Sequence, residues 1–519
     1  MTVTVATVPE LLRRHASVHL DRRVVAAVVA TSSAMVLGAG LTHHTLVRIL
    51  FLIAAIPGVV GLALVAPVTL VVTLAVWLAA LGLVRRLVDS TAGAVAGGFG
   101  DPLLLIAPMV LVVLTAVAVR RGALRDRSRL ANAVLALSAL ALVEAGNPLQ
   151  GSPLVGVAGL LFILVPMLAF WVGRSLVDDT AFRRLMVLVA VLGVGACVYG
   201  LVQQYRGLPS WDAAWVRTAG YTALHIGSGI RSFGTMSSSS EYAAFLGVGL
   251  VICMACLSRL PVVPVALAAG GLLAFGMFED ASRGVVVLAV AAAALMWAAR
   301  RGMRPQAALL VGALGLVVLV VAVGHAVGSP SAATSALVTH QVQGLANPFN
   351  SADSTLPGHF SEMVTGLRSA LTLPIGHGTG SVTIAASRFG GNASGTEVDP
   401  SNMGVALGLP GLIAYLVVAA EGLRLAYRNA AADRTWWTLA ALGVLVVTFL
   451  QWTNGGQYSV AWLPWLVLGW VDRRTSALGI EGSRTVAATC YDDTNASATR
   501  SGAGLPVRDA LVEAERTDR

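Results

Sequence analysis

Apolar runs of about 17–22 residues recur along the chain and are separated by short polar segments. A run of this length spans the hydrocarbon core of a bilayer when it folds as an α-helix. The pattern predicts an all-α, polytopic membrane helical bundle of about 12–14 transmembrane helices. The predicted spans are residues 24–41, 47–66, 68–84, 101–119, 130–146, 153–173, 184–204, 240–257, 262–278, 283–299, 307–327, 402–423, 436–453 and 457–472. The lower count applies if 47–84 forms one broken or re-entrant unit around Ala66–Pro67.

Arginine-rich connections occur in residues 120–129, 174–184, 300–304 and 424–434, and all four fall on the same side of the alternating spans. Short loops rich in arginine face the cytoplasm, so both termini are expected on the cytoplasmic side of the inner membrane. The expected segments are a cytoplasmic N-terminus at 1–23, a membrane domain at 24–327 and 402–472, an extracytoplasmic loop at 328–401 and a disordered cytoplasmic tail at 473–519.

Two long connections then fall on the outer face, at 205–239 and 328–401. The second is too long for a bare connector. Within it, Phe360, Met363, Val364, Leu367 and Leu371 share one helical face. This spacing predicts an amphipathic helix that lies on the membrane domain, ends before Pro374 and is followed by a glycine-rich turn.

The composition is typical of a membrane protein and limits the kinds of partner that the chain is expected to bind. Of 519 residues, 56% are hydrophobic and 12% are charged, and the net charge is +9. All basic residues other than histidine are arginines, and they fall in short loops, so nucleic-acid binding is not expected. The four cysteines suggest no disulfide framework, and no spacing indicates a metal site, so neither a metal nor a cofactor is expected.

Several arginines lie on the predicted outer face, against the general trend. Arg231 and Arg283 each adjoin a long apolar run within the Gly/Ser-rich stretches "RSFGTMSSSS" and "EDASRGVVVLAV". Arginine presents a planar fork that matches phosphate oxygens, and small neighbours let backbone amides approach an anion. We therefore expect these two to bind a phosphate-bearing substrate, with Arg217 assisting. For Arg85, Arg86 and Arg206, snorkelling toward the headgroups is the favoured interpretation.

Other polar residues near these runs allow more than one interpretation. Ser237, Ser238 and Glu241 resemble a capped helix N-terminus, but the same geometry also favours phosphate or sugar hydroxyls. In the long loop, His359 and Glu362 stand one helical turn apart and could act as a proton acceptor and its orienting group. The segment "GHGTGS" lacks the lysine of a P-loop and is interpreted as a turn.

The order of these motifs resembles a known family. "RSFGTMSSSSEYAAFL", "ASRGVVVLAVAAA", "LTLPIGHGTGS" and "DPSNMGVALGLPGLIAYLV" follow one another across about residues 225–420. Together they are similar to the O-antigen ligase and polymerase superfamily of bacterial envelope glycan assembly. The resemblance implies an inverting, metal-independent glycosyltransferase that acts on the outer face. Its donor would be an undecaprenyl-diphosphate-linked glycan, its acceptor a glycan or lipid hydroxyl, and Arg231 and Arg283 would hold the diphosphate.

The chain departs from the ligase pattern where ligases usually carry His-Asn. That place holds Glu397-Val398, with Asp399 two residues beyond Glu397. Glu397, Asp399 or His359 is therefore the expected proton acceptor. A polymerase, or a ligase for another surface glycan, fits as well as or better than a lipid-A-type ligase. A transporter or flippase of lipid-linked glycans is the main alternative, and a membrane scaffold is a further one. A transporter would be favoured by mid-span charges and internal repeats.

Overall fold

The computed structural model describes residues 30, 34, 38, 45–92, 102–125, 127–219, 225–226, 229–327, 336–347, 349–351, 356–396 and 398–477. The chain divides into two compact units, Met1–Asp472 and Arg473–Arg519. The described part is almost entirely helical, with one short hairpin of two antiparallel strands, in which His225 pairs with Ile230 and Ile226 with Gly229. The all-α prediction is confirmed.

In the described residues, the predicted spans from residue 47 onward form helices. They are α3 (Thr45–Val65), α4 (Pro67–Ala92), η1 with α5 (Pro102–Leu105, Ile106–Arg120), α6 (Arg129–Glu144), α7 (Pro153–Leu176), α8 (Asp179–Arg206), α10 (Ser239–Cys256), α11 (Val263–Glu279), α12 (Arg283–Arg301), α13 (Pro305–Val327), α17 (Asp399–Asp433), α18 (Trp436–Val447) and α19 (Trp462–Ala477). The predicted span at 24–41 lies almost wholly outside the described residues.

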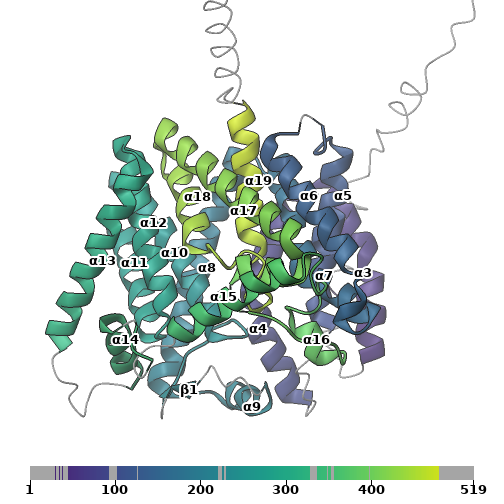
Figure 1. Cartoon of the computed structure of the whole chain (residues 1–519), viewed down its shortest axis with the longest axis horizontal. Helices are drawn as coiled ribbons and strands as arrows, with labels where there is room; N and C mark the ends of the chain where they lie inside the picture. Colours follow the sequence, from purple (N-terminus) through teal and green to yellow (C-terminus); the bar gives the residue numbers. More distant parts are fainter. Residues whose placement is uncertain are drawn as a thin grey trace, which may run out of the picture. The chain divides into compact units, whose positions relative to one another are not determined.

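Shorter elements join these helices. They are η2 (Pro148–Gln150), α9 (Ser210–Ala219), β1 (His225–Ile226), β2 (Gly229–Ile230), η4 (Leu260–Val262), α14 (Ala336–Ala346), α15 (Leu356–Thr372), α16 (Ile384–Arg388) and η5 (Gly455–Gln457). In Figure 1, α9, β1 and α14 lie at the lower end of the bundle, and the α5–α6 and α12–α13 connections lie at the upper end.

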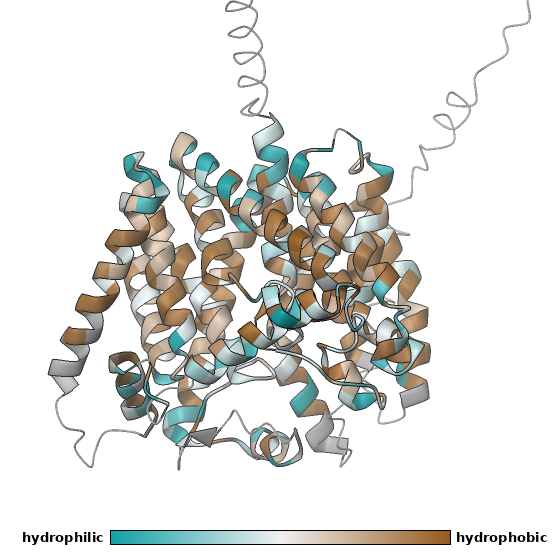
Figure 2. Cartoon of the chain, viewed as in Figure 1, coloured by the Kyte–Doolittle hydropathy of each residue, from teal (hydrophilic) through white to brown (hydrophobic). Residues whose placement is uncertain are grey.

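Eight of the described helices are long and apolar enough to cross a membrane, and α11, α18 and the first part of α13 are shorter apolar helices. Figure 2 shows hydrophobic residues along the middle of the helices and hydrophilic residues mostly toward their ends. Such a distribution is typical of helices that meet hydrocarbon at their centre and headgroups or water at their ends. The region is therefore a multi-pass membrane bundle.

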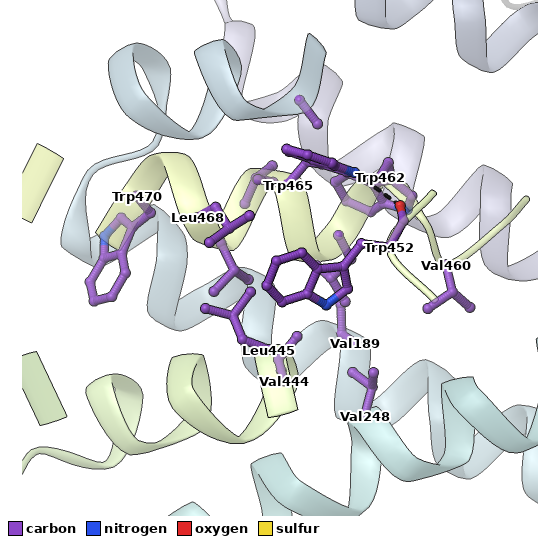
Figure 3. Packing of buried hydrophobic residues seen from close by; sticks show 14 of the residues in the cluster. Val189, Val248, Val444, Leu445, Trp452, Val460, Trp462, Trp465, Leu468 and Trp470 are labelled. Atoms are coloured by element: carbon purple, nitrogen blue, oxygen red, sulfur yellow. Dashed lines mark hydrogen bonds between the residues drawn. The ribbon is translucent and has the colours of Figure 1, made fainter. Parts of the chain in front are cut away.

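The core of the first unit surrounds α19, whose residues up to Val471 are almost all inaccessible to solvent. Four tryptophans mark this core in Figure 3: Trp452, Trp462, Trp465 and Trp470. The indole of Trp465 donates to the Trp452 carbonyl at 2.9 Å. A buried indole needs such a partner, because an unpaired N–H in an apolar interior is costly.

The predicted amphipathic helix is present as α15, which crosses the front of the bundle and packs on the first part of α17. Its contact face differs from the apolar stripe in the sequence. Gly366 and Ala370 are buried against α17, while Phe360 and Leu371 are 58% and 68% exposed. A Cβ on Gly366 would lie 2.7 Å from Cβ of Ser401, so small residues let the two helices approach closely.

Candidate functional site

The segment between β2 and α10 forms a polar loop. Its first residue, Arg231, fixes the loop to the turn between α11 and α12. The Arg231 Nε donates to the Asp280 carbonyl at 2.8 Å, and its Nη2 lies 3.0 Å from the Asp280 carboxylate. Arg231 also donates to the Ser282 hydroxyl, which in turn donates to Asp280. Asp280 and Ser282 lie in the α11–α12 turn, so Arg231 joins the start of the loop that leads to α10 to the residues just before α12.

The α11–α12 turn has a constrained backbone. Ala281, between Asp280 and Ser282, adopts the left-handed conformation with φ 59°. This conformation costs a residue with a Cβ roughly 1–2 kcal/mol. Strain of this kind persists where surrounding contacts hold it, and it often marks a functional position. Here the side chains on both sides of Ala281, those of Asp280 and Ser282, bond to Arg231.

Arg283, the first residue of α12, lies beside this pair and contacts α14. Its Nη2 is 2.6 Å from Nε2 of His340, and a Cβ on Gly344 would lie 1.4 Å from its Nη1. The guanidinium therefore rests directly on the backbone of α14, where only glycine fits. We call Arg231, Asp280, Ser282, Arg283 and His340 the Arg231 cluster. The two arginines expected to act together are thus in one cluster.

Charges within the cluster influence each other. Burial lowers the pKa of His340, and the positive charges of Arg283 and then Arg231 lower it further, so the imidazole stays neutral near pH 7. Burial raises the pKa of the Asp280 carboxyl to about 7, against the opposing effects of Arg231 and Ser282. The Oδ1 atom of Asp280 has no hydrogen-bond partner among the described residues.

The raised pKa of Asp280 predicts a pH dependence of stability. The folded chain holds a proton that the unfolded chain releases between about pH 4 and pH 7, so the free energy of unfolding should fall as the pH rises through that window. Asp280→Asn, which carries no titrating group, should remove this contribution, on the order of a few kcal/mol. Thermal unfolding of both proteins in detergent from pH 4 to pH 8 measures it. Parallel curves for the two proteins would contradict the prediction.

Ser237, Ser238 and Glu241 form a capped helix start. Ser238 is the N-cap of α10 and accepts the Glu241 amide at 3.3 Å, while the Glu241 carboxylate accepts the Ser237 amide at 3.0 Å. The carboxylate, 1% exposed, also accepts the Ser459 amide at 2.5 Å. This pattern is close to a capping box, except that Glu241 accepts the amide one residue before the N-cap, and its bond to Ser459 fixes α10 to the segment before α19.

Arg86 forms a second buried ion pair at this end of the bundle, and the snorkelling interpretation is wrong for it. Its Nε lies 2.6 Å from the Asp212 carboxylate, and both side chains are fully buried. The guanidinium also donates to the carbonyls of Gly234 and Met236. Arg85, 6% exposed, stacks over Trp215 at 5.1 Å and is likewise not a headgroup-facing residue.

Gln203 of α8 completes the support of the polar loop. Its carbonyl oxygen accepts the Phe233 and Gly234 amides at 3.1 and 2.8 Å, and its amide donates to Asp212 at 2.7 Å. The loop is therefore clamped at Arg231 by Asp280 and at Gly234 by Arg86 and Gln203. The other two outer-face arginines, Arg206 and Arg217, are exposed, and Arg217 lies on α9.

The three residues expected to accept a proton lie in different places. Asp399 begins α17 and is fully buried, and its carboxylate accepts the Tyr415 hydroxyl at 2.8 Å and the Thr453 amide at 3.0 Å. His359 is partly exposed near the start of α15. Glu397 lies outside the described residues. The role of each as a base stays a prediction.

Helix α17 is broken at Gly408, which has φ 66° and ψ −164°. The segment after α15 fills the break. The His377 and Gly378 amides donate to the carbonyls of Val405 and Ala406 at 2.7 and 3.0 Å, and the Leu409 amide donates to the Pro374 carbonyl at 3.0 Å. Backbone groups freed by a break within a membrane need such partners. The expected turn at "GHGTGS" is present, and the structure adds that the chain leading into it bonds the broken part of α17, which the sequence did not predict.

No group of three or more His, Cys, Asp or Glu residues within the described part of the chain could hold a metal ion. No protein-family model and no curated protein sequence matches the chain.

Proposed function

We propose that the protein is a membrane glycosyltransferase that transfers or polymerises glycan from an undecaprenyl-diphosphate-linked donor onto an acceptor hydroxyl. The reaction would take place on the outer face of the cytoplasmic membrane, with both termini inside. The observation that carries the proposal is the Arg231 cluster, in which Arg231 bonds Asp280 and Ser282, and Arg283, the residue after Ser282, contacts His340. The order of sequence motifs on these same elements supports it.

In the proposed reaction, the acceptor oxygen attacks the anomeric carbon as the bond from that carbon to the diphosphate oxygen breaks. The lipid diphosphate leaves with the electron pair, and the acceptor proton passes to a base. Negative charge grows on the leaving group, so fixed guanidinium groups stabilise the transition state more than the ground state. Arg231 and Arg283 would supply that charge. Asp280 would hold Arg231 in place and offset part of its charge until the diphosphate binds.

The break in α17 is the feature that most favours the transporter alternative, because transporters often bind substrate at discontinuous helices. In this chain, however, the amides and carbonyls next to the break bond to the Pro374–Gly378 segment. These groups are therefore occupied by the protein's own backbone, which weighs in favour of a structural role for the break.

Reconstitution of the purified full chain with a lipid-linked glycan donor separates the two functions. The enzyme should consume the donor and release lipid diphosphate in liposomes that contain a glycan acceptor, with no other protein present. Movement of intact donor from one leaflet to the other without diphosphate release would contradict the proposal and support a flippase.

A further inference from the structure

A second group of arginines lies at the end of α12 that is opposite to the Arg231 cluster. Arg283 begins α12 and Arg300 lies near its end, and a helix of 19 residues is about 28 Å long. This separation matches the thickness of the bilayer's hydrocarbon core, about 30 Å. The Arg231 cluster and the surroundings of Arg300 therefore lie at the two headgroup levels.

Arg300 lines a cavity of about 840 Å³ with four other arginines, Arg183, Arg184, Arg259 and Arg434. They come from α8, the connection after α10, α12 and the end of α17, so the chain brings them together from distant positions. We call this cavity the arginine pocket. None of the described residues that line it carries a carboxylate.

The acids nearest to these arginines in sequence accept hydrogen bonds from other groups. Asp178 caps α8 by accepting the Ala181 amide at 2.7 Å, Asp179 accepts the Trp470 indole at 3.1 Å, and Asp433 accepts the Thr435 hydroxyl at 2.9 Å. Among the described residues, no ion pair joins any of the five arginines to a carboxylate. Five neighbouring arginines that form no ion pair with a carboxylate repel one another, so the pocket favours an anion.

Two further features favour phosphate. The first turn of α18, with Trp436 and Trp437, lines the pocket, and the hydroxyl of its N-cap residue Thr435 does not bond the helix amides. An uncapped helix start presents N–H donors to an anion. Arg183 stacks over Trp437 at 4.7 Å and Arg259 over Trp436 at 6.0 Å, which fixes the orientation of both guanidinium groups.

An apolar stripe leads away from the pocket along α8. Val187 lines the pocket and is 48% exposed, and Val191, Val198 and Val202 follow on the same helical face with 61%, 49% and 42% exposure. We propose that the arginine pocket binds a phosphate-bearing anion, and that its occupant is the headgroup of an anionic phospholipid whose acyl chain lies along this stripe. Basic pockets between transmembrane helices bind such headgroups.

Native mass spectrometry of the detergent-purified full chain tests this inference, with phosphatidylglycerol and phosphatidylcholine of matched acyl chains as probes. We expect a tightly held phosphatidylglycerol adduct, and a loss of affinity of about 10- to 30-fold in Arg259→Gln/Arg300→Gln. Arg120→Gln/Arg121→Gln is the matched control, since it removes two exposed arginines outside the pocket at the end of α5.

Equal adduct formation in the wild type and Arg259→Gln/Arg300→Gln would overturn the inference, as would equal losses in both double variants. Competition with inorganic phosphate identifies the source of the anion. A lipid adduct that persists at millimolar phosphate supports a headgroup site. Displacement of the lipid at that concentration, with the same dependence on Arg259 and Arg300, would overturn the lipid assignment in favour of a soluble phosphate compound.

Discussion

Arg283→Gln and Arg231→Gln are each expected to lower the rate of glycan transfer per mole of folded protein by about 10²–10³-fold. Each substitution removes a charge whose attraction to the lipid diphosphate would increase as that group departs. The loss should therefore appear in kcat as well as in kcat/KM. Arg283→Lys should recover only part of the activity, because an ammonium keeps the charge but not the planar fork that rests on Gly344. Initial rates of diphosphate release measure these effects.

Arg206→Gln is the matched control for both substitutions. Arg206 lies at the end of α8, is exposed, and is not part of the Arg231 cluster. Its substitution removes the same charge from the same end of the bundle and should leave the rate nearly unchanged. Full activity in either Arg231→Gln or Arg283→Gln, or an equal loss in Arg206→Gln, would refute the assignment.

Arg86→Gln should lower the free energy of unfolding by about 3–5 kcal/mol, because it leaves the buried Asp212 carboxylate without its charged partner. It also removes the donors that hold the Gly234 and Met236 carbonyls, so the polar loop that carries Arg231 should loosen. Chemical denaturation in detergent measures the first effect. Loss of transfer activity at denaturant concentrations too low to unfold the protein measures the loosening of the loop.

A double-mutant cycle distinguishes this ion pair from general damage to the core. Arg86→Gln/Asp212→Asn removes both charges, so its loss of stability should be smaller than the sum of the losses in Arg86→Gln and in Asp212→Asn. Arg120→Gln, at an exposed site, should change stability by less than about 0.5 kcal/mol. Strict additivity of the two single substitutions would show that Arg86 and Asp212 do not stabilise each other.

The hydrophobic pattern predicted the helices well because each span is long and apolar, and the signal is therefore local. Two proline positions illustrate this, since Pro67 and Pro153 each begin a helix where a span was expected. The extent of α17 was less predictable. Its break at Gly408 depends on the Pro374–Gly378 segment, which precedes it by about 30 residues and supplies the bonds that the helix lacks.

The site was predictable only in part, for a related reason. Arg231 and Arg283 were identifiable because an arginine beside a membrane span needs a local explanation. Asp280 adjoins one of them in sequence, but nothing in the sequence indicated that it pairs with the other. Asp212 was not identified, because it sits in a long connection 126 residues from its partner Arg86. Ion pairs between distant elements depend on the fold and leave no periodic signal.

The affinity of the purified chain for a polyprenyl diphosphate shows most directly whether Arg231 and Arg283 together hold this group. Isothermal titration in detergent should give tight binding to the wild type, at least tenfold weaker binding to Arg231→Gln and to Arg283→Gln, and unchanged binding to Arg206→Gln. Polyprenyl diphosphate that binds all four proteins with the same affinity would contradict the account.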